Sequence, residues 1–397
     1  MIPRLREVRI GNYKSIEQAV VSLSGMTVLV GANGSGKSNF VDALAFVQEC
    51  LSTSIEAAFR KRGGVTQVAR HIRAGGREDL EFAFVIDLDP STAAEYGFSI
   101  ASDWNKTPEI IREYCTIREA GEEKHAFELE RGRFTKRIPG IRPLVEPGRL
   151  MLYAASVTPE FQPVYSFLTG VRMYAIHPDD LREPRAPEPG LELESHGRNA
   201  SSVVRVLTER FSDRHARIEG VLRSVVPGLE QVLVETIGSR EFVMFVEATD
   251  RGPGAMLLDA STASDGTLRM LGMLLAVYQP ATPTVLLVEE PEATIHPAAA
   301  DVIVSVLMDA AKRSQVVITT HSPDVLDNKE ITDDMLRVVS KPSGRTVITP
   351  ISSASRTAVR QNLYSPGELL RMDELNPEID PSHPSSAPEI DPAGTAG

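Results

Sequence analysis

The sequence predicts an α/β fold with a mixed or parallel core sheet, an antiparallel β lobe and an inserted helical and irregular region. The first observation is a continuous apolar run at Met26–Val30, followed by a glycine-rich turn and then by apolar residues at three- and four-residue steps over 38–51. The second is an alternation of apolar strands at 285–288 and 316–318 with a helical pattern at 298–311. This order indicates a parallel sheet that begins at Met26 and is completed by the carboxyl half.

The other segments predict the β lobe and the insertion. Eight prolines within 141–200 disfavour long helices and central strands, and so indicate an irregular linker or insertion. Helical periods over 203–225 follow, and then a hairpin pattern over 231–248. Further strand patterns occur at 5–10, 19–23, 81–87, 116–117 and 126–129.

Changes in composition along the chain predict four regions. The last 27 residues hold one Arg against six acids and are rich in Pro, Ser and Gly, so we expect a disordered acidic tail. The regions are an amino-terminal lobe at 1–140, the Pro-rich and helical insertion at 141–230, a carboxyl-terminal lobe at 231–370 and the tail at 371–397.

The net charge and the cysteine content exclude several classes of protein. Lys and Arg total 42 against 54 Asp and Glu, and the net charge of −12 argues against a protein that coats DNA by bulk charge. Cys50 and Cys115 are too few for a disulfide framework and lack the paired spacing of a zinc site. No window approaches the roughly 18 consecutive apolar residues of a membrane span. We therefore expect a soluble protein of the reducing cytoplasm.

A glycine-rich loop joins the first core strand to the first helix. Residues 31–38 (GANGSGKS) satisfy the G-x-x-x-x-G-K-[ST] pattern in the strand–turn–helix context that a phosphate cradle needs, which a chance glycine turn would lack. We expect Lys37 to bridge the terminal phosphates and Ser38 to hold Mg²⁺. The nucleotide-binding residues predicted here are Asn33, Gly34, Ser35, Gly36, Lys37, Ser38 and Asn39.

Two acidic residues follow the buried strand at 285–288. Glu289 and Glu290 stand at its carboxyl end, where the ligands of parallel sheets gather. Glu289 is predicted to bind Mg²⁺, and Glu290 to orient the attacking water as a catalytic residue. The alternative is an exposed acidic strand end without chemistry.

A polar turn precedes the apolar helix at 270–277. Ser264 has the residue type of a helix N-cap, with Asp265 in the first turn. A capped helix would by itself explain these residues. The free N–H groups of such a helix start, the Ser264 hydroxyl and Arg269 would also suit a second phosphate contact.

A histidine follows the apolar strand at 316–318. His321 is therefore expected at the same sheet edge as Glu290, where its imidazole could donate a hydrogen bond to a γ-phosphate. A lone histidine at a strand end is otherwise an ordinary polar residue. Its order after the two acids favours a catalytic set of Lys37, Glu290 and His321.

Taken in order, these motifs resemble the ABC-type ATPases of the SMC, RecF and OLD group, in particular short bacterial ATPases of the AAA15 and AAA21 kind. The resemblance covers about residues 1–370 and includes the opening strand at 5–15, Walker A at 31–38, an element at 195–200, the Ser264–Gly266 signature, Walker B at 285–290, the D-loop His296–Pro297 and the switch histidine His321.

The resemblance implies a P-loop NTPase fold of the ABC head type, with ATP and Mg²⁺ as cofactors. It also implies an ATP-dependent homodimer, in which Ser264 and Gly266 of one copy touch a γ-phosphate held by Lys37 of the other. Two positions depart from the family pattern or match it weakly. Glu289 stands where Asp is usual, and Gln67 is the only candidate for the Q-loop glutamine.

The leading hypothesis is an ATPase whose head dimer closes on ATP and couples hydrolysis to DNA or to a separately encoded nuclease or toxin, in DNA repair or anti-phage defence. One alternative is the ATPase subunit of a membrane transporter. Ser264 lies 226 positions after Ser38, which disfavours it, as does Ser-Asp-Gly in place of the usual Ser-Gly-Gly, and no membrane partner is expected. Another alternative is a slow nucleotide-gated module of a toxin-like system.

Basic residues cluster in three places and are the candidate DNA contacts. A solvated charged surface is the commoner explanation of such clusters. The clusters are 60–62, then Arg70, Arg73 and Arg77, and finally Arg131, Arg133, Lys136 and Arg137.

Overall fold

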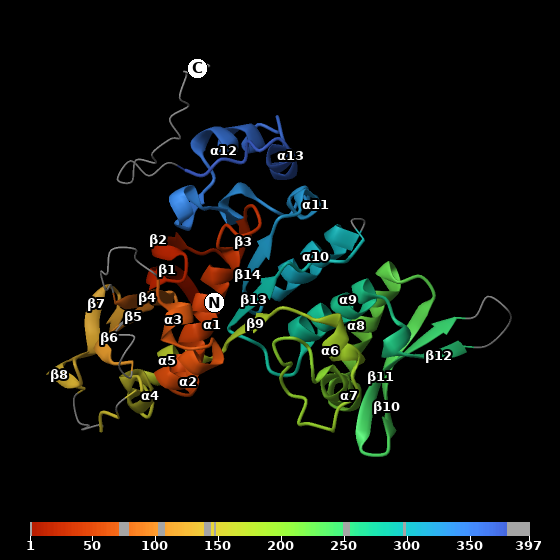
Figure 1. Ribbon diagram of the computed structural model, residues 1–397, viewed down its shortest axis with the longest axis horizontal. Helices are drawn as coiled ribbons and strands as arrows, with labels where there is room; N and C mark the ends of the chain where they lie inside the picture. The colour runs from red at the N-terminus through yellow and green to blue at the C-terminus, as the bar shows by residue number, and fades with distance from the viewer. Residues whose placement is uncertain are drawn as a thin grey trace, which may run out of the picture.

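The computed structural model describes residues 2–70, 79–101, 108–138, 144–146, 148–248, 255–296 and 299–378. The predicted α/β fold is confirmed. Within these ranges the strands form an antiparallel sheet of seven strands, a mostly parallel core sheet of six and a third sheet of three. Figure 1 shows the three sheets in that order from left to right, with helices packed between and around them.

The antiparallel sheet forms because its strands alternate apolar and polar residues. In β1, Leu5, Val8 and Ile10 are buried, whereas Arg6 and Arg9 are exposed. β5 and β8 have no counterpart among the predicted strands. The strand order is β2-β1-β4-β5-β6-β7-β8, with bounds β1 Arg4–Tyr13, β2 Ile16–Ser22, β4 Leu80–Asp87, β5 Thr92–Ile100, β6 Ile110–Glu119, β7 Glu122–Glu130 and β8 Arg133–Lys136.

The core sheet places the two apolar halves of the chain side by side. β3 pairs in parallel with β14, with Val28 opposite Ile318, so the carboxyl half completes the sheet that begins at Met26. Every residue of both strands is buried, as expected for strands covered on both faces. The order is β16-β15-β3-β14-β13-β9, with bounds β3 Met26–Val30, β9 Val171–Tyr174, β13 Val285–Glu289, β14 Gln315–Thr320, β15 Leu336–Ser340 and β16 Val347–Pro350.

Part of the stretch expected to be irregular belongs to the core sheet. β9 lies within the Pro-rich region and pairs in parallel with β13. It is a four-residue edge strand without proline, so the surrounding prolines do not interrupt its hydrogen bonds. The short helices α4 Met151–Ala155, α5 Gln162–Thr169 and α6 Pro178–Arg182 flank it.

Helix α1, Lys37–Ser52, packs between the antiparallel and core sheets. Its Phe40 and Phe46 are fully buried in a cluster that also contains Leu287 of β13, and each such side chain contributes about 1.5–3 kcal/mol. Leu286 points to the other face of β13, into a second cluster with α9 and α10. The remaining helices are α2 Ile55–Lys61, α3 Val65–Val68, α7 Ala200–Arg210, α8 Ser212–Val225, α9 Asp265–Tyr278, α10 Ala300–Ala310, α11 Pro323–Leu326, α12 Ser353–Arg360 and α13 Pro366–Arg371.

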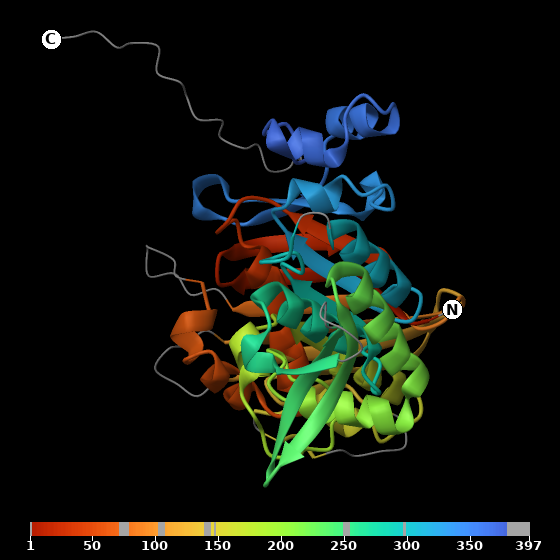
Figure 2. The ribbon, with the colours of Figure 1, turned by 90° about the vertical axis from the view of Figure 1, so that its right-hand side faces the viewer.

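The third sheet contains the predicted hairpin. β10 (Leu229–Ile237) and β11 (Arg240–Ala248) pair in antiparallel register, and β12 (Ala255–Asp259) adds an edge strand. Figure 2 shows the hairpin at the opposite end of the molecule from α12 and α13. No helix in the described part of the chain is both long and apolar enough to span a membrane.

The first residues of the predicted disordered tail, 371–378, are part of the folded structure. Beyond α13, Leu375 is buried, Pro377 forms a bridge with Ile351 and the Glu378 amide donates to the Pro350 carbonyl oxygen. These contacts hold the chain as far as residue 378. Residues 379–397 lie outside the described ranges.

A buried carboxylate joins the antiparallel sheet to α4. Glu113 of β6 is 2% exposed and accepts hydrogen bonds from the Met151 amide at 2.5 Å, the Leu152 amide at 2.8 Å and the Tyr96 hydroxyl at 3.1 Å. Burial raises the pKa of Glu113 from 4.5 to about 7, and the three hydrogen bonds only partly offset that shift.

This raised pKa predicts a pH-dependent stability. The folded state holds the Glu113 proton more tightly than the unfolded chain, so the stabilisation is complete below pH 4.5 and is lost as the pH rises through about 7. We expect Glu113→Gln to remove on the order of 3 kcal/mol from the change in unfolding free energy between about pH 4 and pH 8. Urea titrations at several pH values measure it. Equal pH slopes for this variant, the exposed control Glu119→Gln and the unmodified protein would contradict the prediction.

Candidate functional site

The predicted catalytic residues lie at one edge of the core sheet. β3, β14 and β13 are adjacent and parallel, so their carboxyl ends meet at the same edge. Residues 31–38 follow β3, His321 follows β14 and Glu290 follows β13. The strands, labelled in Figure 1, thus bring Lys37, Glu290 and His321 to the same sheet edge.

The phosphate loop has a conformation that its glycines make possible. Gly34 and Gly36 have φ angles of +76° and +110°, a region that L-residues rarely adopt. A Cβ atom on Gly36 would lie 2.0 Å from Thr346 Oγ1, and one on Gly31 would lie 2.1 Å from the Val339 carbonyl oxygen. Strand β15 and Thr346, the residue before β16, therefore back the loop so closely that only glycine fits there.

Lys37 lies folded back onto its own loop. Its Nζ donates hydrogen bonds to the carbonyl oxygens of Gly31 at 2.7 Å and Ala32 at 3.0 Å. Burial lowers the pKa of the ammonium, and the nearby carboxylates of Glu290, Glu292 and Glu289 oppose that shift. Lys37 is therefore a buried cation facing carboxylates across the sheet edge.

The other residues of the loop differ in exposure and in the hydrogen bonds of their side chains. Ser35 is buried and its hydroxyl has no hydrogen-bond partner, whereas Ser38 is exposed at the start of α1. Asn39 donates a 2.6 Å hydrogen bond to Ser15 Oγ, so its side chain braces the loop. Asn33 and Gly34 are exposed at the tip. Ser35 and Ser38 thus keep the unused hydroxyl groups of the loop.

The acidic strand end and the histidine make direct contact. The side chains of Glu290 and His321 approach to 3.3 Å between Oε1 and Nδ1. Glu290 has a φ angle of +42°, and its amide donates to both oxygens of Thr319, at 3.1 Å to the carbonyl and 3.2 Å to the hydroxyl. Glu289 Oε1 is buried without a hydrogen-bond partner, so it retains a free acceptor.

A third carboxylate, which the sequence analysis missed, belongs to this edge. Glu292 Oε1 accepts a 2.5 Å hydrogen bond from the Thr320 hydroxyl, and its Oε2 is buried without a partner. Burial raises the pKa of Glu292, and the Thr320 bond partly offsets that shift. The Glu-Pro-Glu sequence directly after an apolar strand was the available signal.

The predicted signature forms the start of α9. Ser264 caps α9 by accepting a hydrogen bond from the Thr267 amide at 3.1 Å, which confirms the predicted N-cap. A Cβ atom on Gly266 would lie 2.9 Å from the Thr294 carbonyl oxygen, so α9 begins against the segment that follows Walker B. Within the described ranges, no hydrogen bond joins Ser264 or Gly266 to residues 31–38.

Other predicted residues have varied surroundings. The Arg269 Nε atom is buried without a partner. Gln67 is exposed on α3. Asn199 of the 195–200 element is buried and bonds the Glu192 carbonyl and the Glu194 amide, which explains that element as a brace for the start of α7. His296 is exposed, and Pro297 lies outside the described residues.

The expectation that 60–62 offers phosphate contacts is wrong for Arg62, the last residue of this cluster. Arg62 has a side chain only 10% exposed and is paired with Asp42 at 2.8 Å and with Glu49. Lys61 also pairs with Glu49. The other clusters pair too, Arg70 with Glu17, Arg131 with Glu109 and Lys136 with Glu123, while Arg73 and Arg77 lie outside the described residues.

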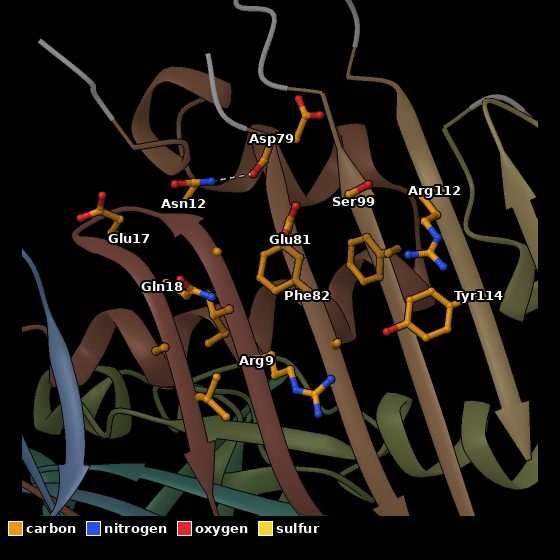
Figure 3. Close-up of a pocket in the computed structure, with 16 residues that line it drawn as sticks. Arg9, Asn12, Glu17, Gln18, Asp79, Glu81, Phe82, Ser99, Arg112 and Tyr114 are labelled. Carbon is orange, nitrogen blue, oxygen red and sulfur yellow. Dashed lines mark hydrogen bonds between the residues drawn. The ribbon is translucent and has the colours of Figure 1, made fainter. Parts of the chain in front are cut away.

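A separate hollow of about 640 Å³ lies on the outer face of the antiparallel sheet. Figure 3 shows Arg9, Glu81, Ser99, Arg112 and Tyr114 around it, on neighbouring strands. Arg9 and Arg112 pair with acids of this chain, Glu7 and Glu128. No residue of the predicted catalytic or nucleotide-binding set lines this hollow.

Comparisons with known proteins agree with this geometry. Over 122 residues the chain is 27% identical to the DNA replication and repair protein RecF of Clavibacter sepedonicus. This aligned stretch covers 30% of this chain and 29% of that protein. The structure is similar to an SMC head crystallised with the C-winged helix domain of ScpA, with a TM-score of 0.55, 13% identity and coverage of 88% of this chain and 99% of that one. At this identity the similarity shows the fold alone.

The family match covers most of the described core. Residues 26–327, about three quarters of the chain, match the AAA_21 family, described as "AAA domain, putative AbiEii toxin, Type IV TA system". That range includes the phosphate loop, the α9 start, β13 with its acids and His321. The protein therefore belongs to the AAA_21 family, among the SMC- and RecF-like P-loop ATPases.

Proposed function

We propose that the protein is a Mg²⁺-dependent ATPase that forms a head-to-head dimer on ATP and passes the resulting change to an effector protein. The observation that supports this most is the meeting of Lys37, Glu290 and His321 at one sheet edge, with Glu290 and His321 3.3 Å apart. A cation for the phosphates, a carboxylate for water and an imidazole for the γ-phosphate are the groups that phosphoryl transfer to water needs.

The residues present also fit a magnesium ion. Mg²⁺ in such sites is usually held by one or two protein oxygens together with phosphate oxygens. Ser38, exposed at the start of α1, and Glu289, with its buried unpartnered Oε1, would supply those oxygens. When bound, the ion neutralises charge on the β- and γ-phosphates.

Hydrolysis then assigns a task to each side chain. Lys37 exchanges the Gly31 and Ala32 carbonyl oxygens for phosphate oxygens. Glu290 orients a water and accepts its proton as the water oxygen bonds to the γ-phosphorus and the bond to the bridging oxygen breaks, which releases ADP and phosphate. His321, held beside Glu290, donates a hydrogen bond to the γ-phosphate oxygen.

The second half of each site would come from another copy of the chain. The α9 start presents the Ser264 hydroxyl and free amides, which suit an anion, yet it makes no hydrogen bond to the phosphate loop of its own chain among the described residues. We propose that Ser264, Gly266 and Arg269 contact the γ-phosphate held by the partner subunit. Light scattering of Glu290→Gln tests this. We expect the mass of a dimer with Mg·ATP and the mass of a monomer without it. A monomer under both conditions would refute the dimer.

Replacement of Ser264 by Arg should separate binding from turnover. We expect Mg·ATP affinity within about threefold of the unmodified protein, loss of the ATP-dependent dimer and at least about 100-fold slower hydrolysis, because the added cation occupies the phosphate contact of the partner subunit. Loss of the cap costs about 1 kcal/mol, so thermal melting checks the fold. Ser352→Arg makes the same change at the N-cap of α12 and should hydrolyse ATP normally. Dimer-dependent turnover in Ser264→Arg would overturn this placement.

A separately encoded nuclease or toxin is the effector that we propose. The ion pairs of Arg62 and Lys61 weaken the argument for DNA, which stays the alternative partner. The similar SMC head was crystallised with a domain of another protein, and the family description names a toxin of a toxin–antitoxin system. Both cysteines are buried and free, which fits the cytoplasm. Co-purification with the products of neighbouring reading frames, with and without Mg·ATP, tests this.

A further inference from the structure

We propose that Glu292 is a positioning residue for hydrolysis, which acts through Thr320 to hold the segment carrying His321 against Glu290. This inference rests on the proposed ATPase function of the site. It adds a residue that carries no role in the scheme above, and it assigns that role from a hydrogen-bonded connection between the ends of β13 and β14.

The connection runs through the Thr320 hydroxyl. That hydroxyl donates a 2.5 Å hydrogen bond to Glu292 Oε1, and its oxygen accepts a 3.0 Å bond from the Ser322 amide. Both bonds are satisfied only if the proton of Thr320 points to Glu292 and the lone pair points to Ser322. His321 lies between Thr320, which carries this hydroxyl, and Ser322, whose amide donates to it, so the backbone of His321 is fixed on both sides.

A second set of bonds completes the brace. The Glu290 amide donates to the carbonyl oxygen and the hydroxyl of Thr319, the residue that precedes Thr320. The segment at the end of β13 therefore forms hydrogen bonds with two residues of β14. The Glu290 amide bonds to Thr319, and the Glu292 carboxylate bonds to Thr320. These bonds and the bond from the Ser322 amide fix the backbone on either side of His321. They hold its side chain 3.3 Å from Glu290.

Burial gives the brace its strength. Thr320 is fully buried, so water does not readily replace Glu292 as the acceptor for its hydroxyl. A hydrogen bond to a carboxylate is stronger than one between neutral groups. Loss of the Glu292 acceptor would leave a buried donor unsatisfied, and the Thr320 hydroxyl would turn toward another acceptor.

The Glu292 carboxylate also lies near the phosphate loop. Its carboxylate acts electrostatically on Lys37 together with Glu290 and Glu289. Since its bonded oxygen faces Thr320, Glu292 acts on the reaction through its neighbours. A small error in the placement of a catalytic group can cost about 100-fold in rate, so a brace of this kind affects turnover more than substrate binding.

Four variants test this role. Glu292→Ala and Thr320→Val each remove one partner of the bond, whereas Glu292→Gln keeps an acceptor and Thr320→Ser keeps the hydroxyl. We expect kcat to fall about 10- to 100-fold in the first pair and by less than about threefold in the second, with Mg·ATP affinity within about threefold throughout. Because both removals break one connection, the double variant Glu292→Ala/Thr320→Val should be no slower than the slower single variant.

Hydrogen–deuterium exchange at Ser322 supplies a readout without hydrolysis. We expect the Ser322 amide to exchange at least about tenfold faster in Thr320→Val and Glu292→Ala than in the conservative pair. If the unmodified protein fails to hydrolyse ATP, the proposed function fails while this exchange still tests the brace. An unchanged exchange rate and kcat in Glu292→Ala would overturn the proposal. A Glu292→Gln variant as slow as Glu292→Ala would also overturn it and would make Glu292 a group that needs its charge in the reaction.

Discussion

Replacement of Lys37 by Ala is expected to weaken Mg·ATP binding at least about 100-fold, the loss of roughly 3 kcal/mol that a charge-assisted contact to phosphate supplies. Lys37 is buried, its ammonium is held among carbonyl oxygens of the loop, and three carboxylates face it. Without this cation a triphosphate would meet those carboxylates unscreened. Isothermal titration with a non-hydrolysable ATP analogue measures the effect.

Lys61→Ala is the matched control for this experiment. The Lys61 side chain is 67% exposed and pairs with Glu49 on the surface, so its loss should leave ATP affinity unchanged. Thermal melting of both variants separates a lost phosphate contact from a lost fold. Normal ATP affinity in a folded Lys37→Ala variant would mean that residues 31–38 do not bind the triphosphate.

Replacement of Glu290 by Gln is expected to slow hydrolysis by about 10² to 10⁴, with ATP affinity retained. The amide keeps the size of the side chain but no longer accepts the proton of the attacking water. The backbone bonds from the Glu290 amide to Thr319 persist, so the left-handed conformation at this residue and the place of His321 should be preserved. Single-turnover phosphate release measures the rate.

Glu235→Gln, an exposed change on β10, serves as its control and should leave turnover unchanged. Full turnover in Glu290→Gln would transfer the role of base to another residue. Glu289 and Glu292 are the other carboxylates at this edge, and the same substitution in each would identify which of them acts.

The core of the fold could be predicted because its strands are continuous apolar runs. Met26–Val30 and Val285–Val288 are covered on both faces, and burial of that kind leaves an unbroken apolar signal. β5 was missed because Thr92–Ile100 holds small residues and Gly97, over which Tyr114 packs, so the strand has little pattern of its own. β9 was missed because four residues are too few for a periodicity.

Site residues could be predicted where their position after a core strand decides where they lie. They could not be predicted where the side-chain contacts made in the folded structure decide their role. Lys37, Glu290 and His321 each follow a core strand, so strand order alone placed them at one edge. Arg62 was misassigned because its partners Asp42 and Glu49 are residues of α1, which charge counting along the chain does not reveal. Glu292 escaped notice because its bond to Thr320 crosses between strands.

The close approach of Gly266 to Thr294 has a mechanical consequence. The first turn of α9 packs directly against the segment that follows Glu290, so a displacement of one is expected to move the other. A phosphate bound to the neighbouring subunit that displaces α9 would thus also displace the segment next to Glu290. In the proposed dimer, ATP bound to one head would affect hydrolysis by the other. Turnover should therefore rise more steeply than linearly with ATP concentration.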